Sequence, residues 1–330
     1  MGILNGNSRQ YQLDNGLVVA LQNNPQSETV SGVIQVNFGF YQEKPGEEGL
    51  SHFLEHAVVT GGSEKFTPEE TEYQIKSIGN FDPRTRLVKT TYPFLNLKED
   101  TESTLDFLSN MVFSPLFDHQ SVEGERKRVL REILDRRSHP NYERNREFNK
   151  MFYKNHPRSI DGCETIERVT LATPDVLRAL HKKAYTPTNS DLVIAGNLPE
   201  SIEELIEKYF GTLKPGDDLR IKSYPRLKPL EEKLISHWPE PSMYNPTHPE
   251  QSSAELSLYM IVPPETSREF FALQILSYSL GGGPLSRLMK SLGAEKGLAY
   301  NISSNYNGSF NAGVFTVNAP GTSKKLDEAI

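Results

Sequence analysis

Two histidines four positions apart, His52 and His56, are the residues whose spacing most directly suggests chemistry. They lie in the stretch GLSHFLEHAVVTGG, and Glu55 directly precedes the second histidine. On a helix, residues i and i+4 lie on the same face, so both imidazoles can reach one cation, and neutral imidazole suits zinc. Zinc lowers the pKa of a bound water towards neutrality, and Glu55 could hold that water and accept its proton.

Two ligands leave such a site incomplete, because catalytic zinc usually takes three protein ligands plus water. The stretch HQSVEGERKRVLREILDRR offers two carboxylates, Glu125 and Glu132, which are seven positions apart and therefore share one stripe of a helix. One could ligate the metal while the other supports it by a hydrogen bond. The alternative is an ordinary amphipathic helix with two satisfied histidines, since a His-x-x-Glu-His spelling arises by chance on the order of once in a hundred chains of this length.

The elements that must position these residues follow from hydrophobic periodicity and capping signals. Strands are predicted at residues 15–22, 30–40, 86–92 and 190–196. Helices are predicted at residues 49–59, 67–78, 99–112, 119–137 and 201–211, and from Thr173 onward. The sequence TPEE, which begins at Thr67, is a capping box with proline at the first helical position.

A second unit is expected after a change in composition. Residues 214–252 are rich in Pro, Lys, Glu and Ser, which predicts an interdomain linker with one short strand near Leu234. Strands at 254–262, 299–306 and 313–319 and a helix at 268–279 are expected to follow, in an order that suggests a weak internal duplication. We therefore predict a zinc-bearing domain over residues 1–213, a linker over 214–252 and a partial second domain over 253–330, whose early end suggests truncation.

Composition narrows the class of protein. The 330 residues include 36 Lys and Arg against 43 Asp and Glu, and the net charge of −7 argues against non-specific nucleic-acid binding. A single cysteine, Cys163, excludes an internal disulfide and favours a reducing compartment, so a cytoplasmic location is expected. No signal peptide and no apolar run of about 18 residues is visible, so no membrane association is expected.

The sequence resembles the pitrilysin and insulinase metallopeptidases, the inverzincins, in a form like that of the mitochondrial processing peptidases. HFLEH matches the inverted zinc motif, DNGLVVAL and GFYQEKPGEEG resemble the strands that lead to it, and LGGGPLSRL and KGLAY resemble the family's second domain. The resemblance implies one zinc ion per chain, bound by His52, His56 and Glu132, with Glu55 as general base and Glu125 as companion carboxylate. It also implies an α+β fold of tandem duplicated units, each a mainly antiparallel sheet flanked by helices, the second unit being of the inactive type.

Three departures from the family's pattern bear on activity. The family pairs a Tyr, here Tyr300, with an Arg seven positions earlier that helps to polarise the scissile carbonyl, but that position is Gly293. The sequence DPRT replaces the family's Asn-Ala-x-Thr, so Asp82 stands where an Asn donates to the substrate backbone, and an ionised Asp cannot donate. The chain also ends roughly a hundred residues early for the family, on a domain-size argument.

The resemblance implies a zinc-dependent endopeptidase that hydrolyses unfolded peptides, each held as an added strand on a sheet edge. Because the zinc residues are present and the Arg is not, we expect the zinc-bearing subunit of a two-subunit peptidase, or a diverged homodimer. The rival hypothesis is a non-catalytic binding or scaffold homologue that retains the zinc site. A third possibility is a fold with an empty site that only assembles complexes.

Overall fold

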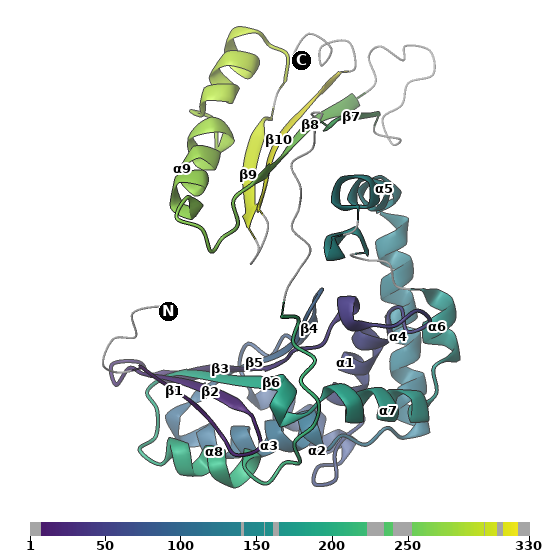
Figure 1. The fold of residues 1–330 in the computed structure, drawn as a ribbon, viewed down its shortest axis with the longest axis vertical. Coiled ribbons are helices and arrows are strands. Elements are labelled where there is room, and N and C mark those ends of the chain that lie inside the picture. The colour runs from purple at the N-terminus through teal and green to yellow at the C-terminus, as the bar shows by residue number, and fades with distance from the viewer. Residues whose placement is uncertain are drawn as a thin grey trace. The chain divides into compact units, whose positions relative to one another are not determined.

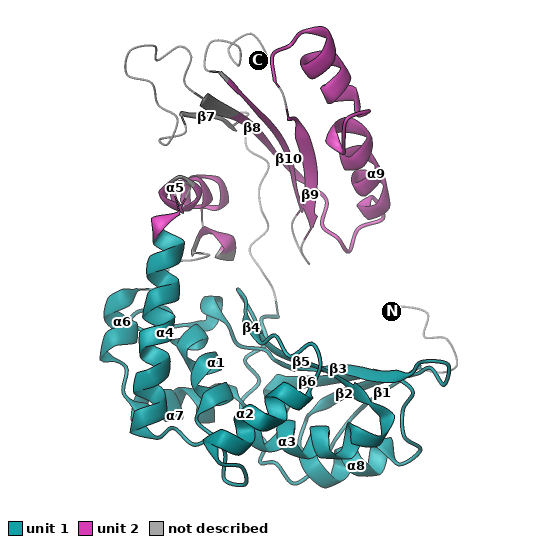
Figure 2. Cartoon of the chain, turned by 180° about the vertical axis from the view of Figure 1, so that it is seen from behind, with its two compact units in different colours: residues 1–137, 160–222 teal, residues 138–159, 223–330 magenta. Residues whose placement is uncertain are grey.

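The computed structural model describes residues 8–139, 142–154, 156–160, 165–222, 234–239, 253–299, 301–308 and 313–322 (Figure 1). The chain forms two compact units, which Figure 2 distinguishes by colour. Unit 1 comprises residues 1–137 and 160–222, and unit 2 comprises residues 138–159 and 223–330. The chain therefore leaves unit 1 after residue 137, returns to it at residue 160 and enters unit 2 again at residue 223.

Unit 1 is built on a six-stranded sheet with the strand order β1-β2-β6-β3-β5-β4. Its strands are β1 (Ser8–Gln12), β2 (Val18–Asn23), β3 (Thr29–Val36), β4 (Arg84–Thr85), β5 (Thr90–Leu97) and β6 (Ser190–Gly196). Neighbouring strands pair antiparallel except β2 and β6, which are parallel. The two-residue strand β4 forms one edge of this sheet.

Helices lie along one side of the unit 1 sheet (Figure 1). They are α1 (Leu50–Thr60), α2 (Pro68–Ser77), α3 (Thr101–Phe113), α4 (His119–Ser138), α6 (Ile166–Leu171), α7 (Pro174–Ala184) and α8 (Ile202–Phe210). Their apolar faces and the inward residues of β2, β3, β5 and β6 form one continuous core. The capping box predicted at Thr67 is present, because Thr67 Oγ1 accepts from Glu70 N at 3.2 Å and the Glu70 side chain accepts from Thr67 N at 2.8 Å.

Unit 2 has a four-stranded antiparallel sheet with the order β7-β8-β10-β9. Its elements are β7 (Leu234–Pro239), β8 (Ser253–Val262), α9 (Phe270–Gly281), a π-helix over Met289–Glu295, β9 (Ser303–Gly308) and β10 (Gly313–Thr322). Helix α5 (Tyr142–Tyr153) also belongs to this unit, and the ring of its Phe148 lies 4.0 Å from the ring of Tyr259 on β8. The predicted fold class, helices on mainly antiparallel sheets, is confirmed.

The strand predicted over residues 86–92 begins too early: residues 90–92 are strand and residues 86–89 are not. Strand β4 ends at Thr85, β5 begins at Thr90, and the residues between them form the hairpin connection. That connection is closed by a hydrogen bond from Arg86 N to Lys89 O at 2.8 Å, and its Leu87 carbonyl accepts from Tyr41 N at 2.7 Å. Sequence analysis also did not predict β1, β4, α5, α6 and the π-helix.

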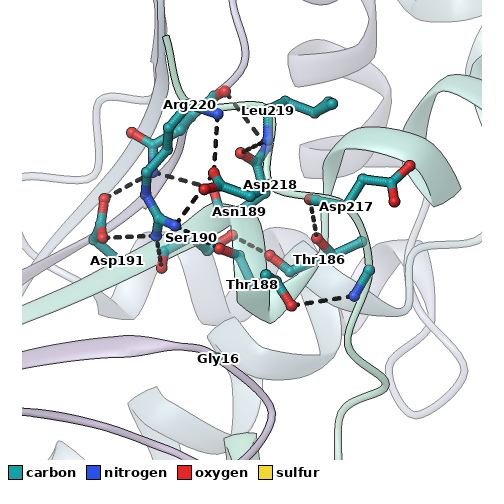
Figure 3. A network of polar contacts seen from close by, with 12 residues as sticks. Gly16, Thr186, Thr188, Asn189, Ser190, Asp191, Asp217, Asp218, Leu219 and Arg220 are labelled. Carbon is teal, nitrogen blue, oxygen red and sulfur yellow. Dashed lines mark hydrogen bonds and ion pairs between the residues drawn. The ribbon is translucent and has the colours of Figure 1, made fainter. Parts of the chain in front are cut away.

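Residues 214–222, where the linker was expected to begin, are bound to unit 1 (Figure 3). The guanidinium of Arg220 donates to Ser190 O at 3.0 Å and pairs with an Asp191 carboxylate oxygen at 3.0 Å. The carbonyl of Thr188 accepts from Arg220 at 2.6 Å. The short strand expected near Leu234 is β7, and the domain boundaries themselves stay predictions.

We predict that His181 on α7 makes unit 1 less stable in acid. Burial lowers the pKa of His181 from 6.5 to about 4, although its ring nitrogen Nε2 donates to Val112 O at 2.9 Å. The unfolded chain therefore binds a proton at a pH where the folded chain does not, so stability falls as pH drops from 6.5 towards 4. This contribution amounts to about 3 kcal/mol once the pH is below both pKa values.

The variant His181→Gln keeps an N–H donor for the Val112 carbonyl but does not titrate. Its urea midpoint, followed by circular dichroism, should fall less between about pH 7 and about pH 5 than that of the wild-type protein. The exposed His119 on α4 supplies the control His119→Gln, which should behave as wild type. Equal pH dependence in His181→Gln and wild type would show that His181 does not carry the effect.

Candidate metal centre

Helix α1, which carries both histidines, starts at a charged cap. Gly49 precedes it with φ of 94°, a conformation that glycine adopts without steric cost. The carboxylate of Glu43 accepts from Gly49 N at 2.9 Å, from Ser51 N at 2.7 Å and from Ser51 Oγ at 2.6 Å. A negative group is stabilising at a helix N-terminus, and this one satisfies amide donors that have no partner within the helix. Glu43 thereby fixes where the helix begins, and with it the direction in which the histidines point.

The structure brings His52, His56 and Glu132 together. The ring centroids of His52 and His56 are 4.9 Å apart, and both side chains are largely buried, with 12% and 14% exposed. Glu132 Oε2 on α4 lies 3.5 Å from His52 Nε2 and 3.5 Å from His56 Nε2. One ligand atom from each of the three residues lies within 4.8 Å of the other two.

This spacing fits zinc. Ligand atoms placed tetrahedrally about 2.0 to 2.2 Å from a zinc ion are separated from one another by roughly 3.3 to 3.5 Å. Both imidazole-to-carboxylate distances, 3.5 Å, agree with that separation. Two imidazoles and one carboxylate also form a donor set typical of catalytic zinc, which leaves a fourth position for water or substrate. The three side chains therefore could hold one zinc ion.

Glu125 contacts the ring nitrogen of His56 that faces away from Glu132. Its Oε2 lies 2.9 Å from His56 Nδ1, and its side chain is 12% exposed. A carboxylate in this position accepts the Nδ1 proton, so the neutral ring presents the lone pair of Nε2 towards Glu132. Arg128 Nη1 in turn donates to Glu125 at 3.3 Å. The structure therefore brings Glu125 into contact with His56, and its role in support of a metal ligand stays a prediction.

Negative charge around His56 acts on its proton affinity. Burial lowers the pKa of His56, but the hydrogen bond to Glu125 and the charges of Glu55, Glu132 and Glu125 outweigh it and raise the pKa above its usual value. A metal ion must displace that proton, because only neutral imidazole ligates. Proton competition with metal at His56 should accordingly begin at a higher pH than at an ordinary histidine.

Glu55 lies beside the three candidate ligands but is not one of them. Its carboxylate is buried, with 7% of the residue exposed. Glu55 Oε2 accepts a hydrogen bond of 2.7 Å from Thr85 Oγ1 on β4. Its position next to His56 in α1 is compatible with a proton acceptor near the metal position.

The remaining predicted residues lie in three different settings. Asp82 is exposed and forms an ion pair with Arg84, so its carboxylate already faces a cation. Gly293 lies in the π-helix of unit 2, where a Cβ atom would come 2.8 Å from Met289 Cε and 3.2 Å from Ala299 O. Tyr300 lies outside the described residues. The roles predicted for Asp82 and Tyr300 stay predictions.

Sequence analysis missed two residues that shape this site, Glu43 and Thr85. Glu43 lies nine positions before His52, and only the turn that precedes α1 brings its carboxylate to the helix start. Thr85 is the last residue of DPRT, the stretch that stands in place of the family's Asn-Ala-x-Thr. Thr85 matches the threonine of that pattern, whereas Asp82 does not match its asparagine. That match is the feature of the sequence that points to Thr85.

Two family models match the chain. The model described as insulinase (peptidase family M16) matches residues 18–161, and the model described as the peptidase M16 inactive domain matches residues 172–330. The chain therefore belongs to the pitrilysin/insulinase family, M16. The expectation from sequence resemblance is confirmed.

Individual relatives are similar over most of the chain. The uncharacterized zinc protease YmxG of Bacillus subtilis is 28% identical over 309 residues, which are 94% of this chain and 72% of that protein. An uncharacterized zinc protease of Rickettsia felis is 26% identical over 318 residues, 96% of this chain and 74% of that protein.

Solved structures show the same fold. A protease from Helicobacter pylori superposes with a TM-score of 0.76 at 21% identity, over 98% of this chain and 78% of that one. Pitrilysin superposes with a TM-score of 0.73 at 22% identity, over 99% of this chain and 35% of that one.

We predict that the protein binds one zinc ion and that Glu132→Gln abolishes stoichiometric binding, because Gln removes the anionic ligand. Glu125→Gln should still bind one ion but with about 10- to 100-fold lower affinity, since it removes only support for a ligand. Competition titration against a chromophoric chelator measures both. The control is Asp135→Asn, which changes an exposed carboxylate three residues beyond Glu132 on α4 and should bind as wild type. Undiminished binding by Glu132→Gln would remove Glu132 from the ligand set.

Proposed function

We propose that this protein is a zinc-dependent endopeptidase that hydrolyses unfolded peptides, and that it is the zinc-bearing subunit of a two-subunit peptidase. The observation that carries the proposal is the convergence of His52, His56 and Glu132 at tetrahedral ligand spacing with Glu55 beside them. Membership of the M16 family and relatives named zinc proteases support the same reaction class.

A zinc ion held by His52, His56 and Glu132 would act as a Lewis acid that lowers the pKa of a water molecule and polarises the peptide carbonyl. Glu55 accepts the proton of the attacking water and then passes it to the leaving amine. Glu125 holds His56 in the tautomer that exposes Nε2. The apolar residues of α1, which are buried in the unit 1 core, keep the two imidazoles from rotating away.

We propose that substrate peptide adds to the edge of the unit 1 sheet at β4. An edge strand presents backbone donors and acceptors on its free side, which suits an extended peptide. Thr85 on β4 contacts Glu55, so a peptide on this edge would pass close to the general base. Asp82, just before β4, would contact that peptide, and its pairing with Arg84 offsets a charge that would otherwise face the peptide carbonyls.

The two-subunit arrangement rests on Gly293. The family's Arg at this position would stabilise the developing oxyanion together with Tyr300, and an oxyanion donor is worth roughly 3 kcal/mol. A related subunit that supplies this cation would complete the site. We propose a homo- or heterodimer with such a subunit.

A non-catalytic binding or scaffold protein is the second candidate. The same Gly293 favours it, because a chain that has lost turnover has no need of the Arg. Against it, His52, His56 and Glu132 lie close enough together to hold a metal ion, and the chain also carries Glu55 next to His56. A scaffold would have no reason to keep Glu55, which does not ligate.

We propose a cytoplasmic location on the strength of the single cysteine, Cys163, which favours a reducing compartment. Among the described helices, none is both long and apolar enough to cross a bilayer.

The experiment that tests the proposed function is hydrolysis of a quenched fluorescent peptide by the zinc-loaded chain and by Glu55→Gln. Gln keeps the shape of the side chain but cannot accept a proton, so turnover should fall by about 100-fold or more while one zinc ion stays bound. The conservative change at the exposed Glu99, Glu99→Gln, should leave turnover unchanged. Full activity of Glu55→Gln would exclude Glu55 from the mechanism, and loss of zinc would make it a ligand.

The partner hypothesis predicts that a related subunit raises peptide hydrolysis by orders of magnitude, and that Gly293→Arg partly restores activity to the isolated chain. The backbone at Gly293 is outside the left-handed region, and the atom closest to a new Cβ is the flexible end of Met289, so a side chain can be accommodated. Gly293→Gln, which adds a polar side chain without a charge, is the control. Robust activity of the isolated wild-type chain that no partner increases would contradict the hypothesis.

A further inference from the structure

The carboxylate of Glu55 is held by a hydroxyl from another element. Thr85 Oγ1 is 2.7 Å from Glu55 Oε2, whereas its other neighbours are farther away, at 3.5 Å for Ser51 O and 3.3 Å for Thr90 Oγ1. A hydroxyl has one proton to donate, and a carboxylate is the strongest of these acceptors. The Thr85 proton is therefore directed at Glu55, and Thr85 is the hydrogen-bond partner that the described residues give this carboxylate.

The hydroxyl of Thr90, next to Thr85, has an acceptor of its own. Thr90 is fully buried and donates its one proton to Phe38 O at 2.9 Å. Its oxygen lies 3.3 Å from Thr85 Oγ1, farther away than Glu55 Oε2 at 2.7 Å. The Thr85 proton therefore stays with Glu55, which is the nearer and stronger acceptor.

Two buried phenols, Tyr92 and Tyr185, are hydrogen-bonded to each other, with their oxygens 2.9 Å apart. Burial raises the pKa of Tyr92 and of Tyr185, and the negative charge of Glu55 raises both further. Both phenols therefore stay neutral at ordinary pH and keep their protons for hydrogen bonds. Neither phenol therefore carries a negative charge that would compete with Glu55 for the proton of the attacking water.

We propose that Thr85 is a positioning residue for Glu55, a role that rests on the proposed peptidase function. Its hydroxyl occupies Oε2 and stops rotation of the carboxylate, which leaves Oε1 to accept the proton from the attacking water. A buried carboxylate that loses its donor carries an uncompensated desolvation cost, so it would turn towards solvent or towards the zinc ligands. Either movement takes the proton acceptor out of line without removing any zinc ligand.

The test compares Thr85→Val, Thr85→Ser and Thr91→Val in the zinc-loaded full chain. Valine has the shape of threonine without the hydroxyl, and serine keeps the hydroxyl. Thr91 is the matched control, because it lies on the neighbouring strand, pairs with Arg84 of β4 and bonds only weakly, at 3.4 Å, to the Arg84 carbonyl. Zinc content, thermal midpoint, kcat and KM for a quenched fluorescent peptide are measured for each variant, with partner subunit added if the wild type needs it.

Thr85→Val should lower kcat by about 10- to 100-fold while KM changes by less than about threefold, with one zinc ion bound. Thr85→Ser should recover kcat to within about threefold of wild type, and Thr91→Val should match wild type. Unchanged kcat in Thr85→Val, or no recovery in Thr85→Ser, would overturn the proposal. A fall in zinc content or in thermal midpoint that accounts for the lost activity would also overturn it, because the role would then be structural.

A crystal structure of zinc-loaded Thr85→Val gives a readout that does not depend on turnover. We expect the Glu55 side chain to leave the position seen in the wild-type protein while His52, His56 and Glu132 stay in place. An unmoved Glu55 would overturn the positioning role. If the wild-type chain hydrolyses no peptide, the proposed function fails, and this structural comparison still decides the role of Thr85.

Discussion

A buried carboxylate–imidazole pair, Glu125 with His56, determines how α4 lies against α1. The pair joins the two helices at 2.9 Å inside a largely apolar core, where breaking it would leave a buried charge without a partner. The next residue, Arg126, reinforces the same alignment: its guanidinium lies 5.2 Å from the centre of the Phe53 ring on α1 and donates to Ala172 O at 2.6 Å, just beyond α6. With α4 fixed in this way, Glu132 can face both histidines.

The site therefore combines three segments that are far apart in sequence. Helix α1 supplies the histidines and Glu55, α4 supplies the two glutamates, and β4 supplies Thr85. Each segment is held by an interaction of its own: the Glu43 cap for α1, Arg126 for α4 and the hairpin to β5 for β4. These three interactions involve different residues, so a mutation that removes one of them should first displace the segment that it holds. The role of the zinc ligands and the role of Glu55 can therefore be tested by separate mutations.

The zinc helix and its partner helix could be predicted because local periodicity decides them. His52 and His56 are four positions apart, and Glu125 and Glu132 are seven positions apart. Each spacing places its pair on one face of a helix, whatever the position of that helix in the fold. The hydroxyl of Thr85 could not be predicted in this way, because its direction depends on where β4 stops and how it pairs with β5. The strand expected over residues 86–92 did not anticipate the end of β4 at Thr85. The tight connection between Arg86 and Lys89 depends on a contact with Tyr41, which is distant in sequence. Likewise, only tertiary contacts reveal that Arg220 holds residues 214–222 on unit 1.

Anomalous diffraction at the zinc edge, from crystals of the zinc-loaded chain, tests the central claim most directly. The account predicts one strong peak about 2.0 to 2.2 Å from His52 Nε2, His56 Nε2 and a Glu132 oxygen, with Glu125 still bonded to His56 Nδ1. A peak bound through His56 Nδ1, a peak with Glu125 in place of Glu132, or no peak between α1 and α4 would contradict it.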